Sequence, residues 1–140
     1  MIRRKEYAQR DLSWSFELLR DAAALVVRLS GRLTLAGLAE LIPLAASRVR
    51  AIGTLNLLLD LRAAELVMTV DDINQVRRIW EATGMPRAVR TAVIAPNDSP
   101  RRSDFAALAN REPASGFERR VFFDSSAAVE WLHGSIGVDA

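Results

Sequence analysis

A short and almost continuous apolar run near the middle of the chain places the strongest limit on its fold. The segment 55–61 reads LNLLLDL, so leucines stand at both even and odd positions. A strand with one face in water alternates apolar and polar side chains, whereas this run is apolar on both faces. It therefore predicts a central strand of a sheet, covered by other elements on both sides.

A well-marked helix start follows this run after a predicted loop. Thr69 has Asp72 three residues later, which is the spacing of a capping box with Asp in place of the usual Glu. Asp71 and Asp72 also place negative charge at the positive end of the helix dipole. We expect a strand that ends at Asp60, a short loop, and a helix that begins after Thr69 and ends before Gly84.

A hairpin is predicted ahead of the central strand. The segment 14–19 begins with alternating apolar and polar residues, and the segment 24–29 is mostly apolar. Ser30 and Gly31 follow, where a turn with positive φ would end the second strand. The two segments are close enough in sequence to pair as neighbouring antiparallel strands.

A helix over residues 35–51 should connect this hairpin to the central strand. Its apolar residues recur at helical spacing, Thr34 is a suitable N-cap, and Gly53 is a natural C-terminal stop. Pro43 lies inside the segment, where proline removes a hydrogen bond and clashes with the preceding turn. We therefore expect a kink or a break at Pro43.

The C-terminal half continues the alternation of strands and helices. A short apolar strand is predicted over 91–95, and Ser103 can cap the helix that follows it. The last strand is predicted over 117–123, with a final helix capped by Ser125 or Ser126. The order predicts an α/β fold with a mixed, largely parallel five-stranded sheet, an N-terminal hairpin and about four helices.

The composition indicates one ordinary globular domain. The 140 residues are 50% hydrophobic and 26% charged, and they suit a single domain over residues 14–135 after a polar arm over residues 1–13. The net charge is only +2, and pairs of arginines are scattered along the chain rather than massed. No nucleic-acid-reading motif accompanies them, so we expect no nucleic-acid partner.

Several site classes lack their sequence signatures. The chain has no Cys and one His, so it offers no thiolate ligand set and no ordinary metal site. His133 is interpreted as a side chain near a helix C-terminus, where a positive charge is favourable. No apolar run reaches the roughly 18 residues of a membrane span, and no targeting segment is recognised, which favours a cytoplasmic protein. No cofactor-binding loop is expected.

Four short segments, in their order and spacing, resemble the STAS superfamily and its SpoIIAA-like group, which is related to the lipid-binding CRAL-TRIO fold. The segments are SGRLT at 30–34, LLLDLR at 57–62, TAVIAP at 91–96 and FFDSSAAVEWL at 122–132. The resemblance spans roughly residues 16–133. It implies a SpoIIAA-like fold and a regulatory role carried out through protein contacts.

The resemblance also directs attention to the start of the helix after the central strand. Anti-sigma-factor antagonists of the superfamily carry Asp-Ser-Ser-Gly there, and the first Ser is phosphorylated. The corresponding positions in this chain are Met68, Thr69, Val70 and Asp71, so only Thr69 retains a hydroxyl. Acidic residues beside Thr69 would repel an added phosphate.

The leading hypothesis is a non-enzymatic module that binds a protein partner around residues 66–74. One alternative is a carrier of a lipid or small apolar ligand that uses the same end of the sheet, and another is a phospho-switch at Thr69. Self-association as a homodimer through an edge strand or an amphipathic helix is a further hypothesis. The residues predicted to bind the ligand or partner are Asp60, Arg62, Leu66, Val67, Met68, Asp71, Asp72 and Ile73.

Overall fold

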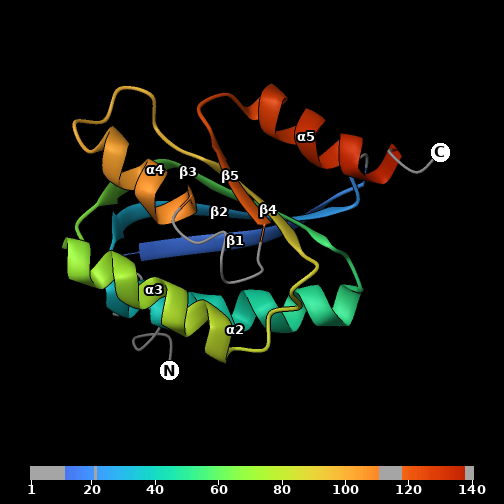
Figure 1. The fold of residues 1–140 in the computed structure, drawn as a ribbon, viewed down its shortest axis with the longest axis horizontal. Helices are drawn as coiled ribbons and strands as arrows, with labels where there is room; N and C mark the ends of the chain where they lie inside the picture. Colours follow the sequence, from blue (N-terminus) through green and yellow to red (C-terminus); the bar gives the residue numbers. More distant parts are fainter. Residues whose placement is uncertain (1–11, 21, 111–117, 138–140) are drawn as a thin grey trace.

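A five-stranded mixed sheet forms the centre of the computed structural model, which describes residues 12–20, 22–110 and 118–137 (Figure 1). The strands lie side by side in chain order, with the first antiparallel to the second and the others parallel. They are β1 (Leu12–Leu19), β2 (Ala24–Leu33), β3 (Asn56–Leu66), β4 (Arg90–Ile94) and β5 (Glu118–Phe122). This arrangement confirms the predicted fold class and the N-terminal hairpin.

Helices pack on both faces of the sheet. The described helices are α2 (Leu35–Ile52), α3 (Val70–Ala82), α4 (Arg102–Asn110) and α5 (Ser125–Gly137). In Figure 1, α2 and α3 run together along one side of the sheet and α5 lies on the other. The helix α4 packs beside α3 and β5.

Alternating side chains of the central strands divide the core into two clusters. Leu25 and Leu57 point toward α2 and α3 in the larger cluster. Val26 and Leu58, their neighbours in sequence, point the other way and pack against Leu132 of α5. The N-terminal half of β3 is therefore covered on both faces, as the leucine run predicts.

The predicted helix termini of α2 and α3 are confirmed. Thr34 caps α2 by accepting the Gly37 N–H at 3.0 Å, and Gly53 ends it with φ of +82°. At the start of α3, the Thr69 hydroxyl accepts the Asp72 N–H at 3.1 Å, and the Asp72 carboxylate accepts the Thr69 N–H at 3.2 Å. Both halves of the capping box are formed.

Two strand ends were predicted wrongly. The strand β2 continues through Ser30 and Gly31 to Leu33, although Gly31 has φ of +95°. The strand β3 continues past Asp60 to Leu66, so the predicted loop is mostly strand. Both extensions have the same cause, because β2 and β3 keep pairing with each other beyond the end of β4.

Other local predictions need correction. The helix α2 runs through Pro43 without a break. Ser103 lies inside α4, and the hydroxyl at its start belongs to Ser99, which accepts the Arg101 N–H at 3.0 Å. Asp124, rather than Ser125 or Ser126, caps α5, because its carboxylate accepts the N–H groups of residues 126 and 127 at 3.3 Å.

The predicted N-terminal arm overlaps the sheet. The strand β1 begins at Leu12, two residues before the predicted start of the domain, and Leu12 is fully buried. The rest of the predicted arm, residues 1–11, lies outside the described residues, as does Phe117 of the predicted last strand. None of the helices in the described part of the chain is both long and apolar enough to cross a membrane.

Candidate functional site

The predicted site residues occupy two separate places in the fold. Asp60 and Arg62 lie in the middle of β3, on the face of the sheet that α5 partly covers. Residues 66–73 lie at the end of β3 and the start of α3. Leu66 lies six residues beyond Asp60 on β3, which at about 3.3 Å per residue is about 20 Å along the strand.

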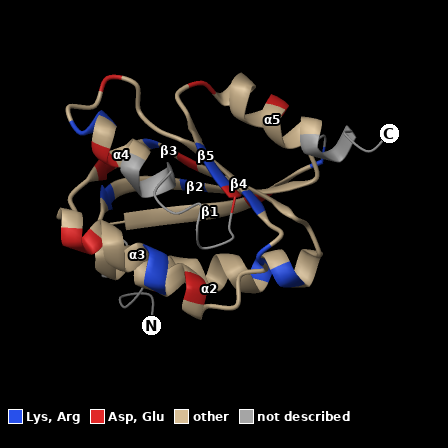
Figure 2. Cartoon of the chain, viewed as in Figure 1, with Lys and Arg blue, Asp and Glu red and all other residues tan. Residues whose placement is uncertain are grey.

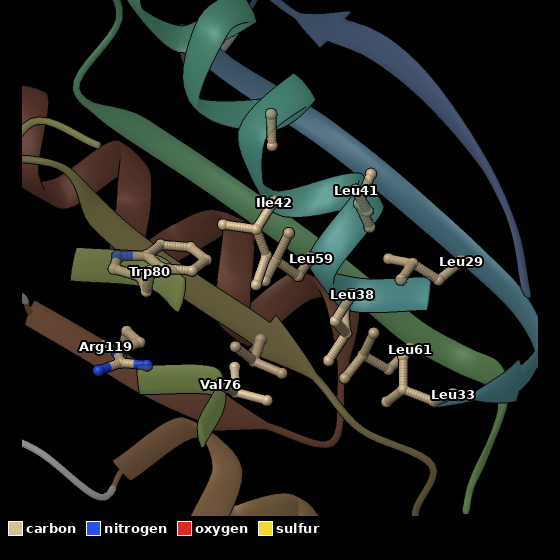
Figure 3. Close-up of a pocket in the computed structure, with 12 residues that line it drawn as sticks. Leu29, Leu33, Leu38, Leu41, Ile42, Leu59, Leu61, Val76, Trp80 and Arg119 are labelled. Atoms are coloured by element: carbon tan, nitrogen blue, oxygen red, sulfur yellow. The ribbon is translucent and has the colours of Figure 1, made fainter. Parts of the chain in front are cut away.

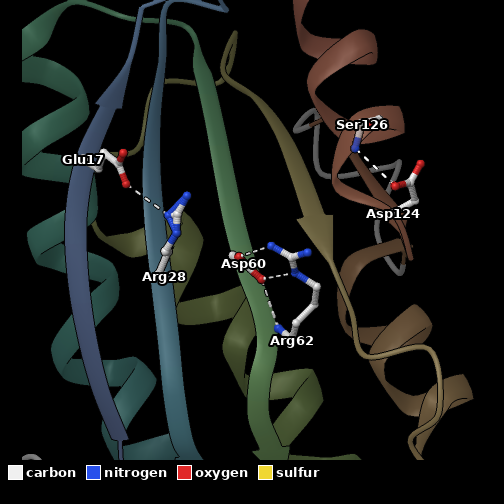
Figure 4. A network of polar contacts seen from close by, with 6 residues as sticks. All are labelled: Glu17, Arg28, Asp60, Arg62, Asp124 and Ser126. Atoms are coloured by element: carbon white, nitrogen blue, oxygen red, sulfur yellow. Dashed lines mark hydrogen bonds and ion pairs between the residues drawn. The ribbon is translucent and has the colours of Figure 1, made fainter.

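Asp60 and Arg62 form a tight ion pair on β3 (Figure 4). The Asp60 Oδ1 accepts the Arg62 Nε–H at 2.9 Å, and Oδ2 accepts Nη2–H at 2.7 Å. The same Oδ1 also accepts the Arg62 backbone N–H at 3.1 Å. A bidentate pair of this kind fixes the plane of the guanidinium group as well as its position.

A β-bulge lies in β3 at this ion pair. Arg28 of β2 lies opposite Asp60, but Ser30 lies opposite Ala63, so β3 holds one extra residue between these pairs. The extra residue leaves Arg62 and Ala63 both exposed, whereas Leu61 is buried. Asp60 and Arg62 are two residues apart and therefore lie on the same face of β3, and the bulge adds Ala63 to this exposed side.

The charges around Asp60 keep it ionised. The hydrogen bonds from the Arg62 side chain lower the pKa of the Asp60 carboxyl below its ordinary value, and they outweigh the opposing effect of burial. The Arg62 backbone N–H and the charges of Arg62 and Arg28 lower it further. In return, the hydrogen bonds that Arg62 donates to the Asp60 side chain raise the pKa of Arg62.

An open groove of about 600 Å³ surrounds this ion pair. The helix α5 packs mainly against β4, with further contacts to β5 and β3, so polar side chains of β1 and β2 remain exposed on this face. We call this concavity the sheet-face groove. Its polar lining residues are Ser13, Ser15, Arg28, Ser30, Asp60 and Arg62.

The lining residues of the sheet-face groove contact one another. Arg28 Nη1 donates to Glu17 at 3.0 Å, and the hydroxyls of Ser13 and Ser30 lie 3.0 Å apart. Figure 4 shows Arg28 and Arg62 on neighbouring strands of the same face, with Asp124 of the α5 N-terminus on the far side of Arg62. The sequence prediction missed Arg28 and the serines, because the pairing of β1, β2 and β3 brings them beside Asp60 and one sequence does not specify this pairing.

The start of α3 presents a different kind of surface. Thr69 and Asp71 are exposed, and Val70 exposes 58% of its surface although it is apolar. We call Thr69, Val70 and Asp71 the α3-start surface. Val70 is the first residue of α3 and packs with neither core cluster.

The other residues predicted for this place have mixed exposure. Leu66, Met68 and Ile73 expose 5% or less and belong to the larger core cluster. Val67 and Asp72 are half-buried. Arg101, the residue before α4, donates to the Leu66 backbone carbonyl at 3.1 Å and so fixes the backbone here. In this structure, a partner would therefore meet the α3-start surface rather than the buried members of the predicted set.

A small apolar cavity lies between the sheet and the helices α2 and α3 (Figure 3). Leucines of β2, β3 and α2 line it, with Trp80 of α3 and Arg119 of β5 at one side. Its volume is about 40 Å³, far below the roughly 300–1,000 Å³ of ordinary ligand pockets. The cavity gives no support to the lipid-carrier alternative.

The arginines are dispersed over several elements, with acidic residues between them (Figure 2). Several of them stack on aromatic rings within the fold. Arg119 of β5 lies over Trp80 on one face of the sheet, at 5.5 Å from the ring centroid, and Arg90 of β4 lies over Trp131 on the other face, at 3.9 Å. These arginines serve internal cation–π contacts.

Within the described part of the chain, the remaining candidates gather into no further site. His133 is exposed near the end of α5. Over residues 12–20, 22–110 and 118–137, no three His, Asp or Glu side chains lie close enough to hold a metal ion.

Comparison with solved structures identifies the fold. An anti-sigma factor antagonist from Mycobacterium paratuberculosis matches 89% of this chain and 96% of its own length, with 18% identity and a TM-score of 0.59. An uncharacterised protein with a SpoIIAA-like fold from Shewanella loihica PV-4 matches 87% and 94%, with 20% identity and a TM-score of 0.57. No protein-family model and no curated protein sequence matches the chain significantly. The chain therefore has the SpoIIAA-like fold that the resemblance implies.

Proposed function

We propose that this chain is a non-enzymatic regulatory module of the STAS type, which binds a protein partner through the α3-start surface. The observation that carries the proposal is the exposed apolar Val70 in the first turn of a fully capped helix. One structural neighbour is an anti-sigma factor antagonist. By analogy with it, the proposed partner is an anti-sigma factor, and the proposed compartment is the cytoplasm.

The capping box supports this role because it holds the first turn of α3 in place before a partner arrives. A pre-organised surface loses little conformational entropy on binding. Val70 would supply the apolar centre of the contact, with Thr69 and Asp71 as its polar rim. Interfaces commonly combine a buried apolar anchor with surrounding polar groups of this kind.

The proposed module acts without phosphorylation of Thr69. The Thr69 hydroxyl is already the hydrogen-bond acceptor of the cap, and the Asp72 carboxylate lies 3.2 Å from the Thr69 backbone nitrogen. A phosphate on Thr69 would therefore meet a negative charge at close range. Partner binding would be controlled by the amount of each protein or by a ligand elsewhere on the fold.

The test is a binding measurement between the purified protein and each anti-sigma factor encoded in the same genome. Val70→Asp should abolish the interaction, because it places a charge in the apolar centre of the contact. Leu55→Asp is the matched control, since Leu55 is similarly exposed, at 51%, but lies at the other end of β3. Binding to at least one anti-sigma factor should survive in this control.

Two results would overturn the proposal. One is the absence of binding to every anti-sigma factor tested. The other is equal affinity of the wild type and Val70→Asp, with circular dichroism showing that both are folded. Unchanged binding by Thr69→Glu would count against a phospho-switch, which predicts that negative charge at this position releases the partner.

A further inference from the structure

We propose that the sheet-face groove is a second binding site, which takes a small polar molecule carrying a phosphate or carboxylate group between Arg28 and Arg62. The groove is independent of the α3-start surface, because it lies on the opposite face of the sheet from α2 and α3. Its volume of about 600 Å³ is in the usual range for small-molecule sites.

The first support is the position of Arg62. Asp60 engages the Nε and Nη2 atoms of this guanidinium, and Nη1 has no hydrogen-bond partner among the residues that the structure describes. The Arg62 side chain is 50% exposed, whereas that of Asp60 is 11% exposed. Asp60 therefore holds a fixed guanidinium at the groove surface, with donors left for an incoming anion.

The second support is the exchangeable partner of Arg28. Arg28 and Glu17 form an ion pair in which both side chains are at least half exposed, and such pairs contribute little to stability. A ligand oxyanion can replace the Glu17 carboxylate on Arg28 at small cost. Arg28 lies opposite Asp60 on the adjacent strand, so both guanidinium groups would then face one ligand.

The hydroxyl groups of the groove add a neutral polar wall. Ser13 and Ser30 bond to each other at 3.0 Å across β1 and β2, and Ser15 stands beside them on β1. Hydroxyls can donate or accept, so they suit the polar body of a small metabolite. Among the side chains that line the groove, Arg28 and Arg62 against Asp60 leave one net positive charge for the anionic group.

The test follows backbone and arginine side-chain NMR signals of the full chain during titration. The probes are inorganic phosphate, succinate and a short polyglutamate peptide. Saturable shifts should centre on Arg28, Ser30 and Arg62, and the more tightly bound small probe identifies the ligand class. If only the polyglutamate peptide binds, the small-molecule proposal is overturned in favour of an acidic protein partner.

Matched substitutions of charged residues distinguish binding in the groove from nonspecific electrostatic binding to the protein surface. Arg28→Gln should weaken binding of the small probe at least tenfold, whereas Arg78→Gln, on the exposed side of α3, should leave it unchanged. Glu17→Gln should strengthen binding about two- to fivefold, because it removes the competing carboxylate. The matched Glu40→Gln on α2 should have no such effect.

The proposal fails if neither small probe gives saturable shifts in the groove. It also fails if Arg28→Gln and Arg78→Gln weaken binding equally, or if Glu17→Gln and Glu40→Gln have the same effect. Arg28 and Glu17 are exposed, so these variants should fold. Each comparison of binding affinities therefore either supports or contradicts the proposal. The anti-sigma-factor binding test uses other residues, so the two proposals can fail separately.

Discussion

At the scale of single residues, Asp60 is the charged group on which the local structure depends most. Its carboxylate accepts three hydrogen bonds from Arg62, and its side chain is 11% exposed. Replacing it with Asn leaves Arg62 without its counter-charge. We expect Asp60→Asn to lower the free energy of unfolding by about 1–3 kcal/mol at neutral pH, as measured by urea denaturation.

The stabilisation by Asp60 should change with pH in a definite direction. Arg62 lowers the folded-state pKa of Asp60 below its unfolded value of about 3.9, so the stabilisation is present above that pH. It is lost as the pH falls through the folded pKa. The difference between wild type and Asp60→Asn should therefore shrink in acid below about pH 3.9. Asp98→Asn, in an exposed loop, is the control and should show no comparable difference.

The sequence could indicate Asp60 but not its environment. Its place in a leucine run predicts a polar group near a buried strand, which the structure confirms. Arg28 lies beside Asp60 because β2 pairs with β3, and a single sequence does not specify which strands pair. The bulge does leave a trace, because the side chains of β3 that pack in or against the larger core cluster are odd-numbered at Leu57, Leu59 and Leu61 but even-numbered at Ala64 and Leu66. This change of phase in the alternation marks an extra residue.

At the scale of elements, the capping box of α3 is the clearest case of sequence specifying structure. Thr69 and Asp72 satisfy each other's backbone N–H groups, as their spacing predicts. We expect Thr69→Ala to lower the free energy of unfolding by about 0.5–2 kcal/mol. Hydrogen exchange in the first turn of α3 should become faster. Thr69→Ser keeps the hydroxyl, so equal losses in both variants would contradict the capping role.

Local patterns predicted element types better than element ends. Thr34 and Gly53 mark α2 because caps are local interactions, and both were predicted. The ends of β2 and β3 depend on each other, since residues 30–33 and 63–66 pair across the sheet. Pro43 was expected to interrupt α2, but it lies on the exposed side of the helix. Water can satisfy the carbonyl that proline leaves without a donor there.

At the scale of the whole molecule, the helices cover the two faces of the sheet to different extents. The layer of α2 and α3 buries the larger core cluster, whereas α5 buries a smaller one and leaves the sheet-face groove open. The sequence predicted the helices, but helix patterns do not state which face each helix covers or how far it extends. Self-association stays a prediction, for which β1 is available as an edge strand of the described sheet.

The unequal layers predict that α5 opens more easily than the rest of the fold. Leu132 is fully buried and joins α5 to Val26, Leu58 and Ile94. We expect Leu132→Ala to lower the free energy of unfolding by about 2–4 kcal/mol, because it removes buried contacts and leaves a cavity. In this variant the rate of backbone amide hydrogen exchange should increase more in α5 than in α2, because the helix that buries the smaller area opens more readily.

An exposed position on the same helix supplies the control. Glu130→Ala, on the solvent side of α5, should change stability by less than about 0.5 kcal/mol. If exchange in α2 and α5 rises equally in Leu132→Ala, the two layers unfold as one unit and the prediction is wrong. If only α5 responds, the helix beside the sheet-face groove can open separately. Its N-terminal Asp124 lies near Arg62, so a ligand in the groove could then alter the stability of α5.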